Sequence, residues 1–140
     1  MSAMTNYLEG ALIAHLFRAV QYSHSSPAAW YVGLLTAAHG EDGTGGTEVS
    51  GNNYARVSVT RGTSTWSKVV STNDYSVSNT GTVTFNAPSG PWGVVTHVGI
   101  WDASTGGNLI LEASLQYSKT INQGDPAPKF NAGDLKFTFN

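Results

Sequence analysis

Beyond Pro27 the chain consists of short apolar runs with the period of a β-strand, separated by segments rich in turn-forming residues. Trp30 to Thr36 is a compact aromatic and branched run, typical of a buried strand. Apolar and polar residues alternate at residues 54–60, 82–87 and 135–140. No helical period recurs to supply the crossovers of a parallel sheet. We therefore expect an all-β fold over residues 28–140, a jelly-roll-like antiparallel β-sandwich of about eight short strands.

The N-terminal residues have a helical period instead. The apolar stripe consists of Met4, Leu8, Leu12, Leu16 and Ala19. Thr5 or Asn6, placed ahead of Glu9, is a candidate N-cap. The pattern predicts one N-terminal amphipathic α-helix over residues 4–20. With 140 residues the chain is long enough for one domain with its own core, so we expect a single domain over residues 1–140.

Charge is scarce in this chain and is dispersed along it. Only 11% of the residues are charged, and the seven Lys and Arg residues form no run that could release many phosphate counterions. We expect no direct contact with nucleic acid. Glu9, His15 and Arg18 interrupt the apolar N-terminal stretch, so we expect neither an export signal nor a membrane span. A surface built mostly from Ser, Thr, Asn and Gly costs little to desolvate and suits packing into an assembly.

His97, Asp102 and Ser104 lie close together in the sequence and raise the question of a catalytic triad. Strand alternation places Val95, His97, Gly99 and Trp101 on one face and Asp102 on the other, so a triad would need an intervening bulge. The interpretation that we favour is a hairpin closed by a Gly-Gly turn. Its second strand would place Leu109, Leu111, Ala113 and Leu115 on one face. We expect no enzymatic activity.

Two other features suggest binding sites. The loop from His39 to Gly51 gathers Glu41, Asp42 and Glu48 among glycines, and a hard cation would accept such ligands. The spacing does not fit an EF-hand, and a solvated loop is the interpretation we favour. The four tryptophans could offer a platform for sugar, but each lies in or beside a predicted strand, which favours packing in a core or an interface. We expect no cofactor and no metal ion.

Several segments in a fixed order resemble a known family. The most specific are "GTGGTEVSG-x-x-YAR" and "WG-x-VTH-x-GI-x-DA-x-TGGNL", and "YLEGALIAHLF", "WYVGLLTA" and "FNAGDLKFTFN" support them. In these segments the chain resembles a group of small bacteriophage virion proteins often labelled tail-fibre proteins. The middle of the chain, "RGTSTWSKVVSTNDYS", matches weakly. The resemblance implies a non-enzymatic structural protein of the virion.

Two places in the virion are compatible with this resemblance. The chain lacks the repeats, coiled coil or triple β-helix that give a fibre its length, so we expect a capsid decoration or cement protein. It would bind the major capsid protein on the outer capsid surface, as a homodimer or homotrimer. The alternative is a tail-fibre or tail-associated protein involved in host attachment. The residues that we expect at contacts with partners are Met4, Leu8, Leu12, Glu48, Tyr54, Arg56, Trp66, Phe137 and Phe139.

Overall fold

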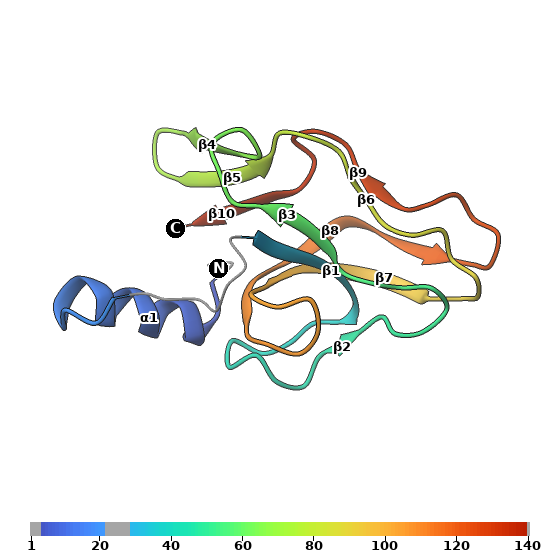
Figure 1. Ribbon diagram of the computed structural model, residues 1–140, viewed down its shortest axis with the longest axis horizontal. Coiled ribbons are helices and arrows are strands. Elements are labelled where there is room, and N and C mark those ends of the chain that lie inside the picture. The colour runs from blue at the N-terminus through green and yellow to red at the C-terminus, as the bar shows by residue number, and fades with distance from the viewer. Residues whose placement is uncertain (1–3, 22–28, 140) are drawn as a thin grey trace.

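The computed structural model describes residues 4–21 and 29–139 (Figure 1). In these residues one helix precedes a series of antiparallel strands. The elements are α1 (Asn6–Phe17), β1 (Ala29–Ala37), β2 (Thr47–Glu48), β3 (Val57–Thr60), β4 (Trp66–Val70), β5 (Tyr75–Asn79), β6 (Val83–Thr84), β7 (Gly93–Trp101), β8 (Leu109–Ile121), β9 (Lys129–Phe130) and β10 (Lys136–Phe139).

The strands form three sheets. Sheet A has the order β2-β1-β7-β8, with β3 also paired to β1. Sheet B has the order β10-β5-β4, and sheet C is the pair β6-β9. Figure 1 shows sheets B and C lying above sheet A, which is the arrangement of a sandwich. The predicted all-β antiparallel fold with one N-terminal helix is therefore confirmed, and the jelly-roll connectivity stays a prediction.

Sheet A is covered on both faces. Val32, Leu34 and Ile100 face the main core between the layers, together with Phe137 from sheet B. A second cluster forms on the outer face of sheet A and consists of Tyr31, Leu35, Trp101 and Leu109. Strand β1 alternates between the two clusters, which is why "WYVGLLT" is apolar at nearly every position. The prediction of a buried strand at this segment is confirmed.

Helix α1 is shorter and more exposed than the sequence predicts. Thr5 is the N-cap, as expected, and its hydroxyl accepts a hydrogen bond from Leu8 N. Met4 lies outside the helix in a β-bridge with Leu111, and Ala19 lies beyond the C-terminal end with a φ of 54°. The predicted helix over 4–20 is therefore corrected to Asn6–Phe17. No residue of α1 is buried, so its apolar positions do not form a stripe packed on the sheet.

The hairpin of β7 and β8 is confirmed, but two irregularities in it change which side chains share a face. The register shifts between Val95 and His97, and Val95 therefore packs in the main core with Val98 rather than on the face of Trp101. A second shift between Ile100 and Trp101 places Leu109 in the outer cluster, opposite to Leu111. The predicted faces of Val95 and Leu109 were wrong because a bulge inverts the alternation that follows it.

The outer face of sheet A is closely packed at Gly33 in β1. A Cβ at this position would lie 2.7 Å from Trp101 Cζ3, 2.8 Å from the Tyr54 hydroxyl and 2.9 Å from Glu48 Oε1. We expect Gly33→Ala to lower the free energy of unfolding by about 1–3 kcal/mol, because these neighbours must move. The control is Gly10→Ala in α1, where a Cβ meets no atom within 4 Å and no loss of stability is expected. Urea unfolding measures the stability of both variants against the wild type. A Gly33→Ala variant as stable as the wild type would contradict the packing described.

Candidate interaction surfaces

The outer face of sheet A carries a polar cluster made of Glu48, Tyr54 and Arg56. Arg56 Nε donates to Glu48 Oε1 at 2.8 Å and Arg56 Nη2 donates to Glu48 Oε2 at 2.7 Å, which is a bidentate pair. The Tyr54 hydroxyl donates to Glu48 Oε1 at 2.8 Å and accepts from Leu34 N at 2.9 Å. The side chains of Arg56 and Glu48 are 6% and 25% exposed. The cluster thus links β2, the segment before β3, and β1.

Arg56 also reaches the turn of the β7–β8 hairpin. Its Nη1 donates to the carbonyl oxygens of Ala103 at 2.7 Å and Gly106 at 2.8 Å. The guanidinium carbon lies 4.1 Å from the centre of the Trp101 ring, a cation–π contact. The cluster therefore satisfies its donors and acceptors within the chain, and its role is to hold together segments that are distant in the sequence.

The environment of Tyr54 favours its neutral form. Burial raises the pKa of Tyr54 far above its ordinary value, and the negative charge of Glu48 raises it further. The ring packs against Phe85 and Trp92, with ring centres 6.2 Å and 5.3 Å away. The hydroxyl is therefore held as a proton donor to Glu48.

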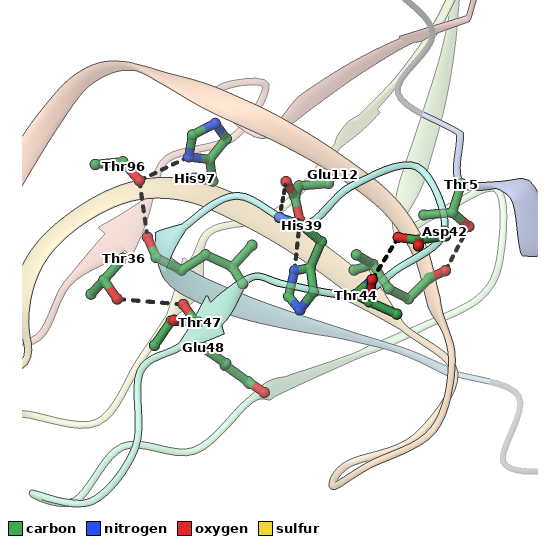
Figure 2. Close-up of polar contacts among 12 residues, drawn as sticks. Thr5, Thr36, His39, Asp42, Thr44, Thr47, Glu48, Thr96, His97 and Glu112 are labelled. Carbon is green, nitrogen blue, oxygen red and sulfur yellow. Dashed lines mark hydrogen bonds and ion pairs between the residues drawn. The ribbon is translucent and has the colours of Figure 1, made fainter.

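A second polar contact lies beside this cluster. Glu112 reaches from β8 to His39, with Glu112 Oε2 2.9 Å from His39 Nδ1, as Figure 2 shows. His39 N donates to both carboxylate oxygens of Glu112. The imidazole also meets the edge of Trp101, with ring centres 6.4 Å apart. This pair fastens the β1–β2 loop to sheet A, and no sequence pattern joins two residues 73 positions apart.

The residues that raised the question of a catalytic triad have other partners. Thr96 Oγ1 lies 2.8 Å from His97 Nδ1 (Figure 2). Asp102 accepts hydrogen bonds from the backbone and side-chain nitrogens of Asn108, at 2.7 Å and 2.9 Å, and so closes the hairpin turn. His97 and Asp102 are thus held apart in separate contacts, and their arrangement is that of scaffold residues.

An apolar groove opens between α1, β8 and sheet B. It has a volume of about 360 Å³, and its lining includes Leu8, Trp30, Trp66, Phe137 and Phe139. Trp66 Nε1 is buried and has no hydrogen-bond partner among the described residues. Arg61 stands at the groove with its guanidinium 5.6 Å from the centre of the Trp30 ring. The groove therefore combines an apolar lining with one unused donor.

Helix α1 extends the apolar surface away from the sandwich (Figure 1). Beyond Leu8 its apolar side chains are exposed, with Leu16 69% and Phe17 81% accessible to solvent. This concentration of exposed large apolar side chains makes α1 a candidate interaction surface. In the described residues no helix is long and apolar enough to cross a membrane.

Seven of the nine residues expected at partner contacts fall into two groups in the structure, and Met4 and Leu12 lie apart from both. Glu48, Tyr54 and Arg56 bond to one another on sheet A. Leu8, Trp66, Phe137 and Phe139 meet at the apolar groove, Met4 packs beside the main core, and Leu12 is exposed on α1. Phe137 is 0% exposed, so its ring is part of the core. Trp30, which was expected in a core or an interface, also lines the groove, whereas no sequence pattern indicated the pairing of His39 with Glu112.

The polar cluster predicts a strict requirement for arginine at position 56. Arg56→Lys keeps the charge but loses the bidentate geometry and the planar contact with Trp101, so we expect the free energy of unfolding to fall by about 2 kcal/mol or more. Arg61→Lys is the matched control, because Arg61 is exposed and lies over the Trp30 ring without an ion-pair partner in the described part of the chain. Urea unfolding measures both variants, and equal losses would argue against the cluster as the stabilising element.

The raised pKa of Tyr54 predicts a loss of stability at alkaline pH. Above about pH 10 the unfolded chain releases the Tyr54 proton while the folded chain retains it, so folding stability falls as the pH rises. Tyr54→Phe removes this contribution, and the stability of the variant should fall less steeply, by up to about 1.4 kcal/mol per pH unit. Urea titrations between about pH 8 and about pH 11.5 measure the slopes, and parallel curves would contradict the buried, protonated hydroxyl.

Comparison with known proteins places these features in a family. Among curated proteins no relative matches the chain. Residues 3–138 match the family described as podophage GP4 fiber I protein gp80. This match covers nearly the whole chain and agrees with the resemblance seen in its segments. The chain therefore belongs to the Gp80 family of podophage fiber proteins, which are structural proteins of the virion.

Proposed function

We propose that this chain is a subunit of a phage fibre and that α1, with the apolar groove beside it, attaches the β-sandwich to another protein of the virion. The observation that carries the proposal is the helix itself. It projects from the sandwich with no buried residue and exposes Leu16 and Phe17 almost completely (Figure 1). A helix in this position gains its stability from packing against a partner.

The energy available at this surface supports attachment. Full burial of a leucine or phenylalanine side chain contributes about 1.5–3 kcal/mol. Leu12, Ile13, Leu16 and Phe17 are all exposed on α1, so a partner that covers them gains several such contributions.

Capsid decoration is the second candidate, and the compactness of the fold favours it. In residues 29–139 the strands are arranged in one short sandwich, without a repeat that would extend it into a shaft. Under this proposal the same surface binds the major capsid protein, and a homodimer or homotrimer sits on the outer capsid surface. Both candidates are virion structural roles, and both use α1 as the attachment element.

The number of copies in each particle separates the two candidates. A fibre subunit occurs in a small number of copies set by the tail, whereas a decoration protein follows the capsid lattice and occurs in hundreds. We expect quantitative mass spectrometry of purified particles to give the low number relative to the major capsid protein. A ratio close to that of the lattice would reject the fibre proposal in favour of decoration.

Attachment through α1 predicts that polar substitutions on the helix block assembly without unfolding the domain. We expect the double substitution Leu16→Gln and Phe17→Gln to change the free energy of unfolding by less than about 0.5 kcal/mol, because both side chains are exposed. Incorporation into particles, measured by immunoblot after complementation of a deletion phage, should fall about tenfold or more.

The control for this experiment is Val94→Thr, which alters an exposed apolar side chain on β7. This variant should enter particles at the wild-type level. Wild-type incorporation of the α1 variant would show that the helix is not the attachment element.

A further inference from the structure

Three lysines line a second groove of the β-sandwich. The groove lies between β8 and the strands β9 and β10, and its volume is about 500 Å³. Lys119, Lys129 and Lys136 line it, whereas the remaining lysine, Lys68, is on β4. In a chain with only seven Lys and Arg residues, this places a large part of the positive charge in one groove, which we call the lysine groove.

The lysine groove carries an excess of positive charge over the described residues. None of the three ammonium groups has an ion-pair partner within the described ranges 4–21 and 29–139. Asp134 is the one acidic residue in the lining, so positive charge is in excess. All three lysines are exposed, and the residues between them include Leu115 and Leu135. The groove therefore offers cations around a partly apolar floor.

The pairing of β8 with β7 is irregular at this groove. Val95 pairs with Lys119 and His97 pairs with Ser114, so residues 115–118 stand opposite Thr96 alone. Leu115, Gln116 and Tyr117 of this bulge line the groove beside Lys119. Lysines around a partly apolar floor suit a polypeptide segment that carries acidic side chains.

The chain itself carries a segment of this kind. The β1–β2 loop has Glu41 and Asp42 exposed at its tip. Thr44 N and Thr44 Oγ1 donate to Asp42 Oδ1 at 3.0 Å and 2.9 Å, and Glu41 O accepts from Asn6 N at 2.8 Å, so the tip has a defined shape (Figure 2). These hydrogen bonds lower the pKa of Asp42 and keep it ionised.

The acidic tip cannot enter the groove of its own chain. Glu112 on β8 binds the loop through His39, whereas the next residue, Ala113, lines the lysine groove. Successive residues of a strand point to opposite faces, so loop and groove lie on opposite faces of sheet A. In Figure 1 the loop between β1 and β2 lies at the lower left, and β9 lies at the right.

We propose that the lysine groove receives the acidic tip of the β1–β2 loop, Glu41 and Asp42, from a second copy of this chain. The contact joins two different surfaces, so it is head-to-tail, and repetition closes a ring or extends a row of subunits. It does not involve the exposed apolar side chains of α1, and it does not depend on the position of the protein in the virion.

The test uses the purified full chain and two charge-reversed variants. Sedimentation velocity at about 100 μM protein, at about 20 mM and about 500 mM salt, measures self-association. We expect the wild type to associate at low salt and to dissociate at high salt, because the contact joins exposed charges. We expect two double variants to associate at least about tenfold more weakly than the wild type. They are Lys119→Glu/Lys129→Glu and Glu41→Lys/Asp42→Lys.

Mixing the two variants is the decisive step. Each then supplies a tip whose charge is opposite to that of the other's groove, so association at low salt should return. Lys68→Glu is the matched control and should behave as the wild type, and circular dichroism verifies that every variant is folded.

Three results would overturn the proposal. The first is a wild type that stays monomeric at both salt concentrations. This result overturns the proposal even if the monomer binds an acidic polysaccharide through Lys119 and Lys129. The second is association that the charge reversals leave unchanged, which would indicate an apolar contact through α1. The third is a failure of the mixed variants to associate although both are folded.

Discussion

The bidentate ion pair between Arg56 and Glu48 organises the outer face of sheet A. A guanidinium that is 6% exposed has lost most of its water, and the chain replaces that water with a carboxylate, two carbonyl oxygens and the face of Trp101. The pair fixes Trp101, whose ring lies over Gly33 and Gly99. The second hydrophobic cluster forms around this ring, so the burial of β1 on both faces depends on it.

The resemblance to virion proteins is carried by the same residues. Glu48, Tyr54 and Arg56 belong to the segment "TEVSGNNYAR", and Asp102, Gly106 and Gly107 belong to the hairpin turn. In the structure these residues bond to one another or shape the turn. The segments that identify the family thus specify the fold. The supporting segments "YLEGALIAHLF" and "FNAGDLKFTFN" instead contribute to surfaces available to partners, on α1 and at the two grooves.

Much of the fold could be predicted from local patterns. The alternation in β3 and β10, the buried run of β1 and the cap at Thr5 depend on neighbours in the sequence, and the structure has them as expected. The faces of Val95 and Leu109 could not be predicted, because bulges in the β7–β8 pair invert the alternation. No residue type in this segment indicates where a bulge occurs. The apolar period of α1 predicted a helix. It did not show whether the apolar side chains of that helix pack against their own chain or against a partner.

The candidate surfaces were less accessible to sequence reasoning. The residues of a contact within one chain are of the same types as those of a contact between chains, so Glu48 and Arg56 were expected to meet a partner although they meet each other. Lys119, Lys129 and Lys136 are dispersed in the sequence and come together only through the pairing of β8 and the return of β10. The sequence shows how many lysines the chain has, whereas the gathering of three of them in one groove depends on the order and pairing of the strands.

We propose that this chain is a fibre subunit of a phage virion, attached through its exposed helix. Immunogold electron microscopy of intact particles, with an antibody raised against the β-sandwich, distinguishes a fibre from a capsid position. We expect gold particles at the tail, on the fibres, and a bare capsid. Gold distributed evenly over the capsid surface would contradict it.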